Sequence, residues 1–82
     1  MRTVTVYMRA GCHLCDDALA VLARVRADLP FALATVDIES DDRLHRAYLE
    51  RIPVVALDGE DLYEHFVDEP DLRGRLDTVS PR

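Results

Sequence analysis

The two cysteines of this 82-residue chain, Cys12 and Cys15, are separated only by His13 and Leu14. Thiols at this spacing can form an intramolecular disulfide, but its closed loop is so short that it stabilises the fold by at most about 2 kcal/mol. A structural disulfide gains more by joining distant segments, and small secreted domains usually have several. The spacing therefore indicates a bond that is made and broken during function.

The cysteine pair falls at the junction between an expected strand and an expected helix. Residues 3–8 are mostly β-branched or aromatic and predict a strand, which the turn Arg9-Ala10-Gly11 ends. After Cys15 the apolar residues recur every three or four positions, which predicts a helix from Cys12 or His13 to about residue 27. Its apolar stripe consists of Ala18, Leu19, Leu22, Val25 and Leu29. This junction is where open α/β sheets tend to place their sites.

The start of a helix favours a thiolate, because unpaired N–H groups and the positive end of the helix dipole face it. Cys12, at the very start, is the expected nucleophile, and Cys15, one turn further along, is the expected resolving thiol. Protonated His13 would stabilise the thiolate, as could Arg9, although an arginine beside a turn is more often simply solvated. Two acidic residues in the first helical turn, at positions 16 and 17, would oppose this effect.

Two other roles for the cysteines stay open. They could form an inert buried pair, or they could bind a metal. Zinc prefers four ligands, and Cys12 and Cys15 would need His45 or His65, whose spacing resembles no zinc finger. We therefore expect no metal site.

The remaining segments predict a parallel strand at 31–38 and a short helix that Ser40 caps and that buries Leu44, Ala47, Tyr48 and Leu49. Residues 54–57 form the next expected strand. Asp58-Gly59 then predicts a two-residue type I′ turn into an antiparallel strand near 61–65. A last helix should begin at Asp68 and turn Leu72, Leu76 and Val79 toward the sheet. The expected fold is a single α/β domain, residues 1–82, of order βαβαββα, with a four-stranded mixed sheet flanked by three helices.

Charge and hydropathy limit the partners. The chain has 16 acidic and 10 basic side chains and a formal net charge of −6, so nucleic acid and anionic membranes should repel it. The alternating residues at the N-terminus do not resemble a signal peptide, which needs a continuous apolar stretch. We expect a cytoplasmic monomer that binds neither nucleic acid nor membrane.

Three segments, in this order and spacing, carry a family resemblance: Tyr7-Met8-Arg9-Ala10-Gly11-Cys12-His13-Leu14-Cys15, Val36-Asp37-Ile38 and Arg51-Ile52-Pro53-Val54-Val55. The chain resembles the glutaredoxin branch of the thioredoxin superfamily, in particular a glutaredoxin-like group with the sequence Cys-His-Leu-Cys. The resemblance implies a thioredoxin-like fold, with Cys12 attacking, Cys15 resolving and Pro53 as a cis-proline facing the disulfide. A trans proline at a strand entry is the alternative. The expected substrate-binding residues are Pro53, Ile52, Arg51, His13 and Arg9.

The departures from the glutaredoxin pattern concern the glutathione site. Glutaredoxins usually have Cys-Pro-Tyr-Cys, Thr-Val before the proline, and a Gly-Gly pair followed by Asp before the last helix. Here Arg51 and Ile52 precede the proline, and the glycine pair is replaced by large side chains such as Tyr63 and Glu64. These should obstruct a ligand that approaches the backbone closely, and Glu64 should repel its carboxylates, although Arg51 would attract one. We therefore doubt that glutathione is the electron donor.

The function expected from residues and resemblance together is a dithiol–disulfide oxidoreductase in cell redox homeostasis, without a cofactor. It would act on protein or small-molecule disulfides and take electrons from a reductase or a low-molecular-weight thiol. The alternative is a thioredoxin-fold adapter whose cysteines hold a metal or an iron–sulfur cluster.

Overall fold

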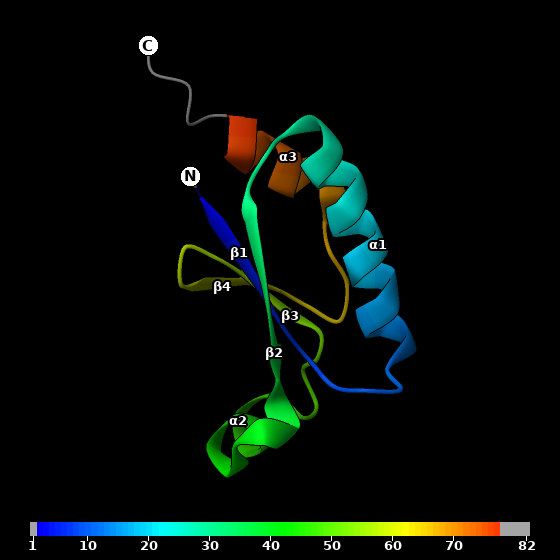
Figure 1. The fold of residues 1–82 in the computed structure, drawn as a ribbon, viewed down its shortest axis with the longest axis vertical. Coiled ribbons are helices and arrows are strands. Elements are labelled where there is room, and N and C mark those ends of the chain that lie inside the picture. The colour runs from blue at the N-terminus through cyan, green and yellow to red at the C-terminus, as the bar shows by residue number, and fades with distance from the viewer. Residues whose placement is uncertain (1, 78–82) are drawn as a thin grey trace.

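The computed structural model describes residues 2–77, which fold into a sheet with helices packed against it (Figure 1). In chain order the elements are β1 (Thr3–Met8), α1 (His13–Asp28), β2 (Ala32–Asp37), a short 3₁₀ turn (Ile38–Ser40), α2 (Asp42–Tyr48), β3 (Val54–Leu57), β4 (Glu60–Glu64) and α3 (Glu69–Asp77). The predicted order βαβαββα and the thioredoxin-like α/β fold are confirmed. No helix within residues 2–77 is both long and apolar enough to cross a membrane.

The four strands form one mixed sheet in the order β2-β1-β3-β4. β1 and β2 run parallel, as the helical connection between them requires, and β3 lies antiparallel on the other side of β1. Because Tyr7 pairs with Val54, the end of β1 lies beside the beginning of β3. The sheet thus brings the segment that leads into the cysteines next to the segment that contains Pro53.

The core lies between the sheet and the two helices α1 and α3, which Figure 1 shows on one side of it. Side chains from all three meet in one apolar cluster, which includes Val4, Val6, Leu22, Val55 and Leu72. Leu22 and Val25 are fully buried, in agreement with the predicted apolar stripe of the first helix. Val79, expected to face the sheet, lies outside the described residues.

The hairpin between β3 and β4 confirms the predicted turn. Asp58 and Gly59 have φ angles of 51° and 91°, and a type I′ turn requires positive values at both central residues. The Asp58 carboxylate also accepts the Thr3 N–H and pairs with Arg2, which ties the turn to the start of β1. This contact holds the Asp58 pKa below its usual value, because the Thr3 N–H and then Arg2 stabilise the ionised form.

The prediction for the second helix was wrong in two respects. Its N-cap is Asp41, whose carboxylate accepts the Arg43 N–H at 2.7 Å, while Ser40 belongs to the preceding 3₁₀ turn and donates to the Asp37 carbonyl. None of its residues is buried, so Leu44 and Ala47 do not form a core face. Figure 1 shows α2 at the end of the sheet opposite α3, and none of its residues belongs to the core cluster that the sheet forms with α1 and α3.

Candidate functional site

The cysteine pair lies at the N-terminus of α1, as predicted. Cys12 is the N-cap residue, and its Sγ accepts a hydrogen bond from the Cys15 N–H at 3.1 Å. The Cα atoms of the two cysteines lie 5.2 Å apart, and their sulfur atoms are joined as a disulfide. Most N-caps are oxygen-bearing side chains; here a sulfur atom satisfies one of the unpaired N–H groups of the first turn. The helix therefore directs a backbone donor at the sulfur that we expect to be the nucleophile.

The two sulfur-bearing residues differ in exposure. Cys12 is half-buried, whereas Cys15 has no exposed surface and packs on the inner side of α1. His13 and Leu14 between them are exposed, so these two residues border the half-buried cysteine on the outer surface. A partner can therefore approach Cys12 but not Cys15.

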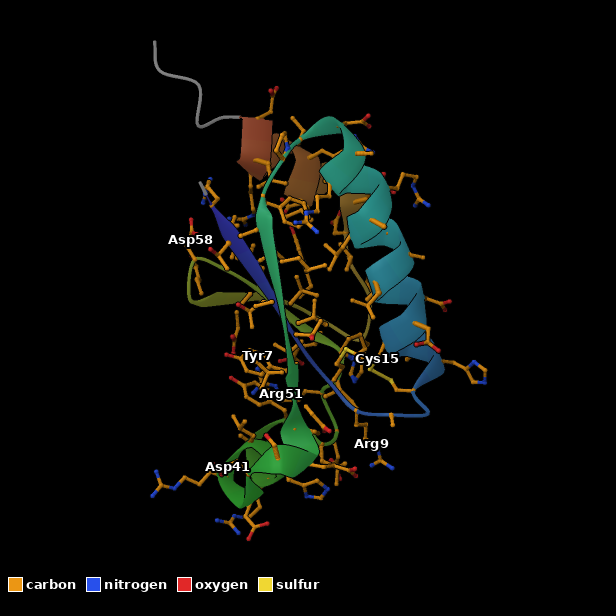
Figure 2. All side chains as sticks on the ribbon, in the orientation of Figure 1. Tyr7, Arg9, Cys15, Asp41, Arg51 and Asp58 are labelled. Atoms are coloured by element: carbon orange, nitrogen blue, oxygen red, sulfur yellow. A yellow bond between two sulfur atoms is a disulfide. The ribbon has the colours of Figure 1, made fainter. Side chains whose placement is uncertain are left out.

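Arg9, an expected binding residue, lies in the loop between β1 and Cys12. Its Nε is 3.8 Å from the Glu39 carboxylate in the 3₁₀ turn, and both side chains are largely exposed. An exposed ion pair at this distance contributes little to stability, so the Arg9 side chain can exchange Glu39 for another anion. Figure 2 shows Arg9 projecting from this loop below Cys15.

The segment before β3 lies at the end of the sheet where β1 leads into the cysteine pair. The Ile52–Pro53 peptide bond is cis, Pro53 is buried and Ile52 is half-buried. The Pro53 carbonyl accepts the His65 N–H at 2.8 Å, which joins this segment to the loop after β4. The pairing of β1 with β3 thus brings Cys12, Ile52 and Pro53 to the same end of the sheet.

The loop after β4 has the backbone conformation that a glycine would adopt most easily. His65 has a φ of 72°, and the Phe66 N–H donates to the Glu64 carbonyl two residues earlier, which makes a γ-turn. The His65 ring contacts the Glu50 carbonyl at 2.9 Å and holds the turn to the end of the α2 segment. Phe66 is consequently exposed, with 69% of its surface accessible.

Arg51 does not point into open solvent as a free binding group. Its Nε donates to Glu64 at 2.7 Å, another of its nitrogens lies 3.6 Å from Asp61, and its guanidinium stacks 4.9 Å from the centre of the Tyr48 ring. The sequence suggested that Arg51 attracts a ligand carboxylate while Glu64 repels it. The structure instead joins the two side chains to each other.

Sequence reasoning missed the stacked tyrosines that support this cluster. The rings of Tyr7 and Tyr48 lie 4.5 Å apart and almost parallel, and the Tyr48 hydroxyl donates to Asp61 at 3.3 Å. Figure 2 shows Tyr7 and Arg51 in the region between the sheet and α2. The signal for this contact in the sequence was weak. Tyr7 is an aromatic residue on the face of β1 away from the core, and Tyr48 of α2 can pack against it.

The described residues show no set of metal ligands. Nowhere within residues 2–77 do three or more histidine, cysteine or acidic side chains gather in a metal-binding arrangement. The cysteine pair itself has the geometry for thiol–disulfide chemistry.

Comparison with known proteins agrees with this geometry. The family model of the glutaredoxin-like domain (DUF836) matches residues 3–77. An uncharacterised protein of Mycobacterium tuberculosis is 33% identical over 78 residues, which cover 89% of this chain and 80% of the relative.

Solved structures show the same fold. A structural-genomics target protein from X. campestris is 39% identical, with a TM-score of 0.75 and coverage of 95% of this chain and 99% of that one. A protein from Nitrosomonas europaea is 30% identical, with a TM-score of 0.80 and coverage of 90% and 89%. A mutant thioredoxin from Halobacterium salinarum, 22% identical with a TM-score of 0.68 and coverage of 99% and 76%, shares the fold. The chain belongs to the glutaredoxin-like (DUF836) family and has the thioredoxin fold.

Proposed function

We propose that this protein is a dithiol–disulfide oxidoreductase that acts through Cys12 and Cys15. The observation that carries the proposal is the hydrogen bond from the Cys15 N–H to the Cys12 Sγ at the start of α1. In the reduced protein the same donor, together with the positive end of the helix dipole, stabilises a Cys12 thiolate. Such a thiolate attacks disulfides at neutral pH and is also a good leaving group.

The exposures of the two cysteines support the different roles that we propose for them. Cys12 is half-buried and can reach the disulfide of a partner, whereas Cys15 is fully buried and can reach only Cys12. The Cys12 thiolate attacks one sulfur of the partner, forms a mixed disulfide and releases the other sulfur as a thiolate. Cys15 then loses its proton and attacks Cys12, which releases the second partner sulfur. In sum, the partner gains two electrons and two protons, and the protein gains its internal disulfide.

The substrates that this role implies are protein or small-molecule disulfides, with a reductase or a low-molecular-weight thiol restoring the dithiol. Pro53 and Ile52 support the docking of an extended partner segment, because they lie beside the end of β1 that leads into the cysteines. Backbone pairing with an extended segment is a common way of binding a peptide. We place the protein in the cytoplasm, where thiols are kept reduced.

The decisive experiment is to trap the mixed disulfide with single-cysteine variants. Cys15→Ser should accumulate a mixed disulfide at Cys12 with a small model disulfide, because the resolving thiol is missing. Cys12→Ser is the matched control and should accumulate none, because the remaining thiol is buried. Mass spectrometry of the intact variants distinguishes the outcomes, and trapping at Cys15 alone would reverse the assigned roles.

A second measurement separates this role from that of a metal or cluster carrier. Absorbance titration of the reduced protein should show a thiolate at Cys12 that ionises more readily than a free cysteine. Metal analysis after anaerobic purification is the companion test. Stoichiometric metal that is lost in Cys12→Ser would replace the oxidoreductase proposal with the adapter alternative.

A further inference from the structure

The charged cluster around Arg51 occupies the hydrogen-bonding positions that a substrate carboxylate would use. Glu64 accepts from the Arg51 Nε at 2.7 Å, Asp61 lies 3.6 Å from a second nitrogen, and the Ala47 carbonyl lies 3.4 Å from a third. The Tyr48 ring packs against the guanidinium and fixes its plane. A side chain with this many partners is oriented before any ligand arrives.

A β-bulge places both carboxylates on the same side of the sheet. In β4, Asp61 and Glu64 are three residues apart, and in a regular strand such residues point to opposite faces. The pairing shifts by one residue between Val55 and Ala56, so Asp61 lies opposite Ala56 and Glu64 lies opposite Val54. The extra residue in β4 turns Asp61 toward Arg51 as well. The cluster then carries one positive and two negative charges.

This cluster lies at the end of the sheet where β1 leads into the cysteines, because Glu64 pairs with Val54 and Val54 pairs with Tyr7. Arg51 precedes the cis proline Pro53 by two residues, and the following strand begins opposite Tyr7 at the end of β1. Arg51 also lines a surface hollow together with residues 45–47, 49 and 50, so a small ligand has room beside the guanidinium. A thiol that carries a carboxylate would approach an arginine already paired, and it would also face two carboxylates.

We propose that Glu64 takes the place of a substrate carboxylate on Arg51, so that the site selects against anionic low-molecular-weight thiols and accepts neutral or cationic ones. This inference rests on the proposed oxidoreductase function and names its class of small-molecule partner. Arg51 is the specificity-determining residue, and Glu64 keeps it occupied.

The test compares glutathione, an anionic thiol, with a derivative that lacks its carboxylate charges. Two molecules of glutathione reduce the Cys12–Cys15 disulfide to the dithiol and become one glutathione disulfide, so two electrons and two protons are transferred. Glutathione diethyl ester performs the same reaction without the carboxylate charges. Stopped-flow rates for both thiols are measured with the wild type, with Glu64→Ala and with Arg51→Gln/Glu64→Ala.

Glu60→Ala is the matched control, because Glu60 lies on the same exposed strand and no ion pair joins it to Arg51 within residues 2–77. Exposed ion pairs contribute only weakly, so removing the Glu64 partner of Arg51 in Glu64→Ala should raise the glutathione rate by about two- to fivefold. The ester, which has no carboxylate for Arg51 to bind, should show no such gain in Glu64→Ala. The gain should disappear in the double variant and be absent in Glu60→Ala.

A titration with S-methylglutathione, which has the same charges but no thiol, measures binding without redox chemistry. Followed by NMR, its dissociation constant should fall by about two- to fivefold in Glu64→Ala and return to the wild-type value in the double variant. An equal gain in Glu60→Ala, or a gain that survives the loss of Arg51, would overturn the inference. If dithiothreitol cannot convert the disulfide into a dithiol, the proposed function fails, while this titration still decides the role of Arg51.

Discussion

Reducing the Cys12–Cys15 disulfide should change the stability of the fold only modestly. The bond closes a loop with a sequence separation of three. For the four residues from Cys12 to Cys15, the chain-entropy relation gives an entropy loss of about 6 cal/mol/K in the unfolded chain, or about 2 kcal/mol at 25 °C. The hydrogen bond from the Cys15 N–H to Cys12 does not require the disulfide, so α1 keeps its cap after reduction.

Urea unfolding of the oxidised and reduced protein, followed by circular dichroism, measures this difference. For a domain of this size the free energy of unfolding falls by about 1 kcal/mol per molar urea, so the midpoints should differ by at most about 2 M. The double variant Cys12→Ser/Cys15→Ser is the control and should unfold at nearly the same urea concentration with and without reductant. A reduced protein that is unfolded in buffer, or a difference above about 4 kcal/mol, would show that the disulfide is a structural staple and would refute the reasoning.

Three further predictions concern the scaffold. Leu22→Ala should lower the free energy of unfolding by about 2–5 kcal/mol in urea titrations, because the fully buried side chain leaves a cavity between α1 and the sheet. Asp41→Ala should cost about 1 kcal/mol by the same measurement and lower the helix content, since it removes the N-cap of α2. Hydrogen bonds from Arg24 and Arg73 lower the pKa of Glu69 to about 2. Ionised Glu69 therefore stabilises the fold above its unfolded-state pKa, and this contribution is lost as the pH falls toward 2. Glu69→Gln should therefore destabilise the protein at pH 7 but not at pH 2, as thermal unfolding at the two values would show.

The sequence predicted the parts of the fold that depend on local pattern. The apolar spacing of Leu22 and Val25 located α1, and the Asp58-Gly59 pair specified the hairpin, because both signals arise from neighbouring residues. The cysteine pair was placed correctly for the same reason, since a helix start is a local feature.

What the sequence did not predict depends on register and on distant contacts. Glu64 meets Arg51 only because of the pairing of β3 with β4 and the bulge within it, and neither follows from residue types. The buried face expected for α2 was wrong because α2 lies at the end of the sheet, away from the core between the sheet, α1 and α3, and packs there through the stacking of Tyr48 on Tyr7. The predicted N-cap, Ser40, was wrong by one position. Ser40 and Asp41 are adjacent and both are common N-cap residues, and only the backbone conformation shows that Asp41 begins the helix.

The sulfur cap of α1 also connects the redox state to a spectroscopic signal. The Cys15 amide proton points at the Cys12 sulfur, so a change of that sulfur between disulfide, thiol and thiolate alters the shielding of this proton directly. A backbone amide resonance thus serves as an intrinsic sensor of the cysteine pair, without any label. Its chemical shift can follow oxidation, reduction and ionisation of the pair in a single sample.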